Sequence, residues 1–258
     1  MKKWFGTMGI IFGCLWLIPV GSLHAQQIVS IDFSKAQGYT DGHLFGQPAG
    51  QAAKWQDGGG SSTGAKLYEI NKETLLITQD AGGDRWALFT IPTQTGKFTV
   101  TFDWQYVGAA DSTVDVGFCI SDKANFSLDG NDAPTYNEQG VMGRMYSDPA
   151  TVSARNGDWA GGGTYDALVE LSYTDGIKVF MRYEIDASKA AQTFNVYARK
   201  EGSAEVKLAE NFGFRQDCPD GLNTIAIWET GTVAGTQVII DNILLTGPAP
   251  VQDWELHE

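Results

Sequence analysis

Apolar and polar residues alternate with a period of two along much of this chain. In the segment 97–107 (KFTVTFDWQYV), every second residue is large and apolar, namely Phe98, Val100, Phe102, Trp104 and Tyr106. The residues between them are threonine, aspartate and glutamine. Successive side chains of a strand point to opposite faces of its sheet, so this pattern predicts a strand with one buried face.

The same kind of segment recurs along the chain, separated by Gly, Asp, Asn and Ser clusters. The further predicted strands are 74–78, 85–91, 113–120, 168–173, 177–185, 193–199, 222–228 and 236–245. Extended helical periodicity is absent. Short alternating strands between turn signals are typical of antiparallel sheets packed on a common core. The sequence therefore predicts an all-β fold, an antiparallel two-sheet sandwich.

Two stretches break the strand pattern. Residues 47–64 are rich in Gly, Ser and Ala, and residues 121–163 are long, polar and rich in Gly and Asp. We expect both to be loops. A long loop in a compact domain is usually functional or flexible, so these stretches are candidates for a binding role.

The N-terminus has the pattern of a secretory signal peptide. Lys2 and Lys3 precede an apolar run over residues 4–20, and a short polar stretch then ends at Ala25. A membrane anchor is the alternative, but the run is only about 17 residues long, at or below the spanning length. We therefore expect residues 1–25 to be removed, residues 26–247 to form one sandwich domain and residues 248–258 to be a tail.

Export predicts a secreted, periplasmic or cell-surface protein without stable membrane insertion. The whole chain has a net charge of −13 at pH 7. Nucleic acids and anionic membrane surfaces require a basic face, so this charge argues against both as partners. It is compatible with Ca²⁺ and with neutral or cationic polymers.

The cysteine and histidine content limits the possible chemistry. Beyond the predicted leader the cysteines are Cys119 and Cys218, and the histidines are His43 and His257. In an exported chain the two cysteines are candidates for one disulfide, with two separate thiols as the alternative. So few histidines argue against a His-rich metal site and against a Ser-His-Asp triad.

Aromatic side chains in the loops are candidates for carbohydrate binding. A sugar ring presents an apolar C–H face that stacks on an aromatic plane. Trp55 and Trp159 lie in glycine-rich stretches, and Tyr165 follows the second of them. We expect Trp55 and Tyr165 to contribute to carbohydrate binding, and Trp159 to be either an exposed stacking residue or a plug in its loop. Trp104 and Trp228 share the apolar phase of their strands, and we expect them in the core.

Polar side chains on the outward phase of the strands are the other candidates. The predicted outward residues include Arg182 and Glu184 in one strand, Tyr197 in the next and Asp115 in a third. If these strands are neighbours, their side chains form one polar surface. Such a surface either binds a ligand or is simply the solvated face that every antiparallel sandwich has.

Both ends of the chain carry a family resemblance. Residues 31–55 (IDFSKAQGYTDGHLFGQPAGQAAKW) and residues 238–247 (VIIDNILLTG) resemble exported bacterial jelly-roll domains of the concanavalin A-like lectin/glucanase type. The resemblance implies that the first strand returns beside the last. It also implies a structural Ca²⁺ held by Asp32 and Asp241 with backbone carbonyls.

This fold serves several functions, so the resemblance leaves the function open. Its laminarinase-type glycosidases carry E-x-D-x-x-E, but residues 184–189 read EIDASK, with Lys189 in place of the last carboxylate. We therefore expect non-catalytic binding of a polysaccharide or surface glycan. One alternative is a polysaccharide lyase that uses Arg182, Tyr197 and Glu184. A second is a structural or adhesive surface protein.

Overall fold

The computed structural model describes most of the chain after the leader. The described residues are 25–60, 67–79, 83–108, 114–122, 140–147, 150–157, 171–172, 174–231 and 235–248. The predicted signal peptide up to residue 24, Trp159 and Tyr165 lie outside them. In the described part, no helix is long and apolar enough to cross a membrane.

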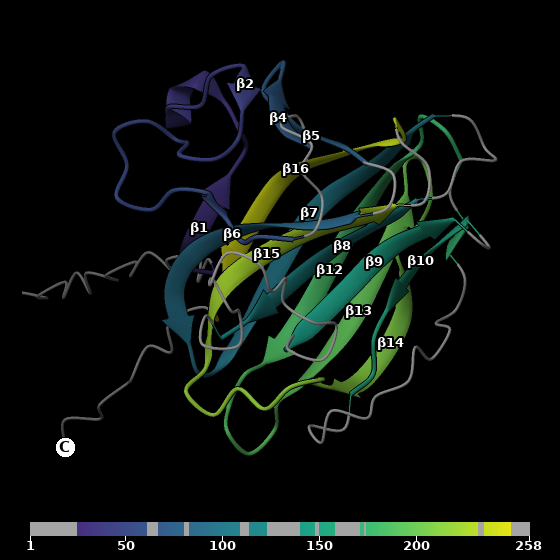
Figure 1. Cartoon of the computed structure of the whole chain (residues 1–258). Coiled ribbons are helices and arrows are strands. Elements are labelled where there is room, and N and C mark those ends of the chain that lie inside the picture. Colours follow the sequence, from purple (N-terminus) through teal and green to yellow (C-terminus); the bar gives the residue numbers. More distant parts are fainter. Residues whose placement is uncertain are drawn as a thin grey trace, which may run out of the picture.

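Two antiparallel sheets lie face to face, as Figure 1 shows. Sheet A runs in the order β14 (Val206–Gly213), β13 (Thr193–Lys200), β12 (Lys178–Asp186), β7 (Lys97–Val107), β16 (Gln237–Thr246), β5 (Thr74–Thr78), β4 (Tyr68–Asn71) and β2 (Gly42–His43), and β1 (Gln27–Ile31) also pairs with β16. Sheet B runs in the order β11 (Leu171–Ser172), β10 (Ala150–Ala154), β9 (Val141–Ser147), β8 (Asp115–Ser121), β15 (Leu222–Gly231), β6 (Gly83–Gln94) and β3 (Gln56–Asp57). The predicted two-sheet sandwich is confirmed, and a single 3₁₀ turn, η1 (Lys35–Gln37), is the helical element of the described residues.

The first and last strands lie side by side in sheet A, as the resemblance implied. β1 pairs with the second half of β16, from Gln27 opposite Thr246 to Ile31 opposite Ile243. β5 pairs with the first half of β16 on the same side. An irregularity after Asp241, where Asn242 has a φ of 53°, separates the two halves.

The main core fills the space between the sheets. The alternating residues of β7 are buried, at 0–4% exposure, and β7 begins and ends where the sequence predicts. Phe102 of sheet A stacks on Phe118 of sheet B, with ring centroids 4.0 Å apart. Tyr183 packs edge-on against Phe102 at 5.5 Å. The apolar side chains of the alternating pattern therefore pack between the two sheets, as the sequence predicts.

The predicted loop over residues 121–163 is wrong in its second half, which contains β9 and β10. The alternation is hidden there because both faces of β9 carry large residues. Val141 and Met145 point to the main core, whereas Met142 lies on the outer face of sheet B. Gly143 leaves room for Tyr183, whose hydroxyl would lie 1.9 Å from an added Cβ.

A second apolar layer covers the outer face of sheet B. Its members are 0–2% exposed, namely Trp86, Leu88, Cys119, Met142, Ala226 and Trp228. Trp228 is buried as predicted, but it belongs to this layer and not to the main core. Its indole lies over Gly117, where an added Cβ would be 1.9 Å from Nε1.

The predicted disulfide between Cys119 and Cys218 is absent, and both thiols are free and buried. Cys119 lies against the Trp228 indole. Cys218 lies instead beside Ser121, with Sγ 3.8 Å from its Oγ. Ser121 is two residues after Cys119 in β8, and residues with this spacing lie roughly 7 Å apart along a strand. Cys218, which lies beside Ser121, is therefore displaced along β8 from Cys119.

Candidate functional site

The outer face of sheet A carries a continuous set of polar side chains. β12 and β13 pair so that Arg182 faces Tyr197, Glu184 faces Asn195 and Phe180 faces Arg199. The intervening residues of both strands are buried. The predicted alternation is therefore confirmed, and Arg182, Tyr197 and Glu184 are brought together on one surface.

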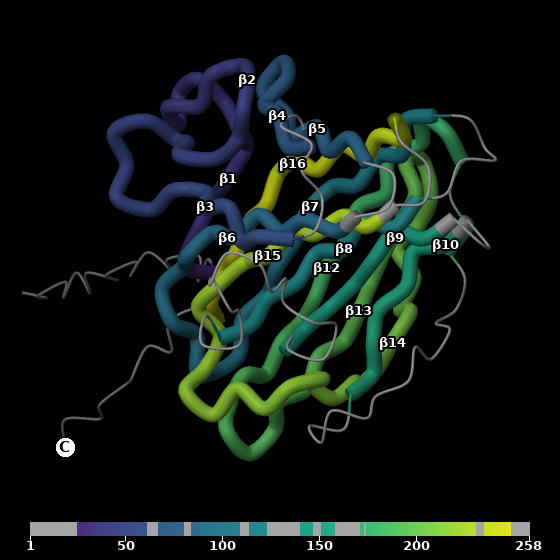
Figure 2. Tube along the Cα trace, in the orientation of Figure 1, coloured from purple at the N-terminus to yellow at the C-terminus, as the bar shows by residue number. Residues whose placement is uncertain are grey.

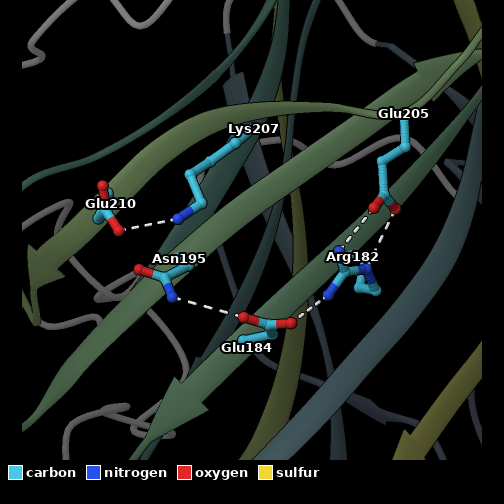
Figure 3. Close-up of polar contacts among 6 residues, drawn as sticks. All are labelled: Arg182, Glu184, Asn195, Glu205, Lys207 and Glu210. Atoms are coloured by element: carbon cyan, nitrogen blue, oxygen red, sulfur yellow. Dashed lines mark hydrogen bonds and ion pairs between the residues drawn. The ribbon is translucent and has the colours of Figure 1, made fainter.

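Arg182 lies between two carboxylates, as Figure 3 shows. Its Nε and Nη2 donate to the two oxygens of Glu205 at 3.0 and 2.6 Å. Its Nη1 donates to Glu184. A planar guanidinium that forms parallel bonds to a carboxylate is held in one orientation, so this cluster is rigid before any ligand arrives. We call Arg182, Glu184 and Glu205 the Arg182 network.

Both carboxylates of the network are ionised at neutral pH. The hydrogen bonds from Arg182 lower the pKa of Glu205. Burial on its own would raise the pKa of Glu184, but hydrogen bonds from Arg182, Asn195 and Tyr197 outweigh it and lower the pKa. Both groups can therefore accept hydrogen bonds and cannot donate a proton.

Two cationic side chains lie beside the Tyr197 ring, and Tyr197 also forms hydrogen bonds with Glu184 and Lys207. The Arg182 guanidinium lies 3.8 Å from the centre of its ring, and Lys207 Nζ lies 5.5 Å away. Lys207 also donates to Glu210 at 2.8 Å, a contact that Figure 3 draws as well. The Arg182 guanidinium covers one face of the Tyr197 ring. Tyr197 therefore serves mainly to position the Arg182 network, and less to stack against a sugar.

Two hollows open on this face of sheet A. The first, which we call the Glu184 hollow, has a volume of about 490 Å³. Its polar lining comes from the ends of β7, β12, β13 and β16 and from β14, namely Lys97, Thr99, Glu184, Asp186, Thr193, Asn195, Asn211 and Thr246. The second, the Arg199 hollow, has a volume of about 450 Å³. Its lining includes Asp32, Asp103, Phe180, Arg182, Arg199 and Asn242. The Arg182 network contributes to both.

Asp32 and Asp241 are neighbours, as the resemblance implied. The pKa of Asp241 is raised by burial and by the charges of Asp103 and Asp32, while the Asn242 amide lowers it. However, Asp32 accepts the Ser34 amide at 3.0 Å, so it also closes a local turn. No group of three or more acidic, histidine or cysteine residues in the described part is arranged to hold a metal ion. Ca²⁺ at Asp32 and Asp241 remains an implication of the resemblance.

Asp115 lies on the other side of the molecule and does not join the Arg182 network. It faces Tyr146 across β8 and β9 on the outer face of sheet B. Its carboxylate is 3.5 Å from Arg144, whose guanidinium lies 4.2 Å from the Tyr146 ring centre. Burial raises the pKa of Asp115 to about 7, although the charge of Arg144 opposes it. This carboxyl group is therefore partly protonated at neutral pH.

Trp55 is a core residue, and its predicted role in sugar stacking is wrong. Its side chain is 1% exposed. The indole Nε1 donates to the Tyr39 hydroxyl at 3.0 Å, and the ring packs against Phe89 at 5.2 Å. Figure 2 shows residues 32–57, in purple and blue, as a lobe at one end of the sandwich. Trp55 anchors this lobe and presents no ring face to a ligand.

Two site residues were not proposed from the sequence, although one of them carries a signal. Arg199 follows Tyr197 in the outward phase of β13, so the alternation alone places it on the polar face. Glu205 lies in the turn between β13 and β14, where no pattern links it to Arg182. Its role is visible only once the turn brings it over the strand.

Several solved structures similar to this chain are lectins or a glycoside hydrolase domain by name. The chain is similar to lectin I-B4 from Griffonia simplicifolia, with a TM-score of 0.53, 14% identity and coverage of 84% of this chain and 98% of that one. Lectin II from Ulex europaeus gives a TM-score of 0.56 at 8% identity, covering 86% and 99%. The catalytic domain of a glycoside hydrolase family 131 protein from Coprinopsis cinerea gives 0.55 at 11%, covering 88% and 98%.

These likenesses establish the concanavalin A-like sandwich fold. No family model matches the chain, and no curated protein matches it in sequence. At identities this low the fold is shared, and the chemistry has to be argued from the residues of this chain.

Proposed function

We propose that this protein binds a carbohydrate on the outer face of sheet A, in the two hollows that adjoin the Arg182 network. The observation that carries the proposal is the network itself. Arg182, Glu184 and Glu205 are held in fixed orientations by their mutual bonds and border both hollows. Preorganised polar groups lower the entropy lost when a ligand binds.

The lining suits the hydroxyl groups of a sugar. Carboxylates accept hydrogen bonds, amides both donate and accept, and hydroxyls do either. The Glu184 hollow combines Glu184 and Asp186 with Asn195 and Asn211. Both volumes fall within the range of about 300–1,000 Å³ that is usual for small-ligand sites.

The protonation states of Glu184 and Glu205 favour binding over hydrolysis within the Arg182 network. A glycosidase with two carboxyl groups needs one that is protonated and donates to the leaving oxygen. Glu184 and Glu205 both have lowered pKa values. A lyase that used Arg182 to neutralise a uronate would have to displace carboxylates that Arg182 already binds.

The likeness to lectins supports this proposal through the fold, and the predicted leader would place the activity outside the cytoplasm. The proposal does not depend on a calcium ion.

A second candidate function is catalysis on sheet B, favoured by one observation. Asp115 is a buried carboxyl group with a pKa of about 7, beside Arg144 and Tyr146. A carboxyl group that keeps its proton near neutral pH can act as a general acid. This candidate predicts shortened polymer in the experiment below.

Native affinity electrophoresis against soluble neutral and acidic polysaccharides tests the main proposal. We expect at least one polymer to retard the protein, and we expect size-exclusion chromatography to show that polymer intact after incubation. Failure of every polymer to retard the protein would contradict the proposal. Shortened products would favour catalysis over non-catalytic binding.

The variant Glu184→Gln tests the location. Glutamine keeps the shape of the side chain but removes the negative charge that accepts hydrogen bonds from Arg182 and Asn195. We therefore expect the affinity for the polysaccharide, measured from the retardation, to fall about tenfold. The control is Glu229→Gln, a buried glutamate on sheet B that is remote from both hollows. If this control is destabilised, the exposed Asp220→Asn, which lines neither hollow, serves instead. Equal retardation of Glu184→Gln and wild type would place the binding elsewhere.

A further inference from the structure

Arg199 differs from Arg182 in what its guanidinium binds. It lies 3.7 Å from the centre of the Phe180 ring, which faces it across β12 and β13. Among the described residues, no carboxylate or carbonyl accepts a hydrogen bond from it. It therefore has a fixed position, set by the stack, and N–H groups that are left to bind a ligand.

The carboxylate of Glu205, on which the charge of Arg199 acts, is already engaged. Glu205 uses both oxygens on Arg182, at 3.0 and 2.6 Å. Arg199 affects Glu205 only through its charge, which lowers the pKa of that carboxyl group slightly. A guanidinium that stacks on a ring and keeps its N–H groups available matches a planar carboxylate, because it can bind the carboxylate through two parallel hydrogen bonds.

The opposite wall of the Arg199 hollow suits sugar hydroxyls. Across the sheet the order on this face is Arg199, Phe180, Asp103 and Asp241. The Asp103 carboxylate already has two polar neighbours. It accepts a hydrogen bond from Asn242 Nδ2 at 2.7 Å and lies 3.5 Å from Lys178 Nζ. This hollow thus has a cation at one wall and hydrogen-bonding groups at the other.

We propose that the Arg199 hollow selects a sugar that carries a carboxylate, with the uronate group paired to the Arg199 guanidinium and its hydroxyls bonded to the Asp103 and Asn242 wall. This inference rests on the proposed function and names its ligand class. It makes Arg199 the residue that determines specificity, while the Arg182 network stays intact as a neighbouring wall.

The test compares polygalacturonate with its methyl ester, which has the same backbone without the charge. We expect wild-type protein to bind polygalacturonate about tenfold more tightly, as one charge-assisted pair implies. Arg199→Gln should bring both affinities to the level of the ester. Arg199→Lys, which keeps the charge but loses the fork, should retain part of the preference. Arg85→Lys on sheet B is the control and should behave as wild type.

The outcomes separate this inference from the function on which it rests. Equal affinity of wild type for both polymers, or a preference that survives Arg199→Gln, overturns the uronate assignment and leaves carbohydrate binding standing. Tighter binding of dextran sulfate than of polygalacturonate, with no binding of dextran, assigns the site to sulfate and overturns it also. Binding of no polysaccharide at all refutes both. Thermal unfolding of the Arg199 variants at the wild-type temperature confirms that they are folded.

Discussion

Two acidic side chains on opposite faces of the sandwich differ in charge because their neighbours differ. Glu205 receives two hydrogen bonds from Arg182, which lower its pKa. Asp115 is more buried and has one arginine at 3.5 Å, so burial dominates and raises its pKa to about 7. The same residue chemistry thus gives a fixed anion on sheet A and a titrating group on sheet B.

The raised pKa of Asp115 predicts how stability depends on pH. An acid whose pKa is higher in the folded state contributes stability below its unfolded pKa, near 4, and this is lost as pH rises through 7. Between pH 4 and pH 8 we expect the free energy of unfolding of wild type to fall by about 2–4 kcal/mol relative to Asp115→Asn. Urea unfolding of both proteins across this range measures the difference. Parallel curves would show that Asp115 titrates normally.

At the scale of the elements, the two sheets owe their different outer faces to small residues. Gly117 in β8 allows the Trp228 indole of β15 to lie flat over the strand and close the second apolar layer. Among the described residues the outer face of sheet A carries no such layer, and it is polar and hollowed. The apolar cover of sheet B and the ligand face of sheet A therefore depend on different strands.

Gly117→Ala should separate these two roles. The new Cβ would lie 1.9 Å from Trp228 Nε1, so the indole has to move, and we expect a loss of about 1–3 kcal/mol in the free energy of unfolding. Gly96→Ala is the control, because an added Cβ there meets nothing within 4 Å. Denaturant unfolding followed by tryptophan fluorescence measures both. Carbohydrate binding by the folded fraction should be unchanged, and a variant as stable as wild type would contradict the packing described for Trp228.

At the scale of the whole molecule, the sequence predicts the sandwich better than the site. Period-two alternation finds strands such as β7 because one face is apolar and the other polar. It fails for β9, where Met142 and Met145 occupy both faces. The glycine-rich surroundings of Trp55 are also misleading, because its burial in the lobe depends on Tyr39 and Phe89 from distant parts of the chain.

The candidate site divides in the same way. Arg182, Glu184 and Tyr197 follow from the alternation of two neighbouring strands. Glu205 does not, because its contact with Arg182 depends on how the turn after β13 folds back. The predicted disulfide shows the same limit, since a cysteine count carries no information about which positions are adjacent.

The location of carbohydrate binding is the central claim, and hydrogen–deuterium exchange tests it most directly. The experiment compares the protein alone with the protein plus the polysaccharide that retards it most. We predict slower exchange in the turn at residues 201–205 and in β14, which border the Arg182 network at the edge of sheet A. Slower exchange confined to β6, β8 and β9 of sheet B, with the 201–205 turn unchanged, would contradict the account.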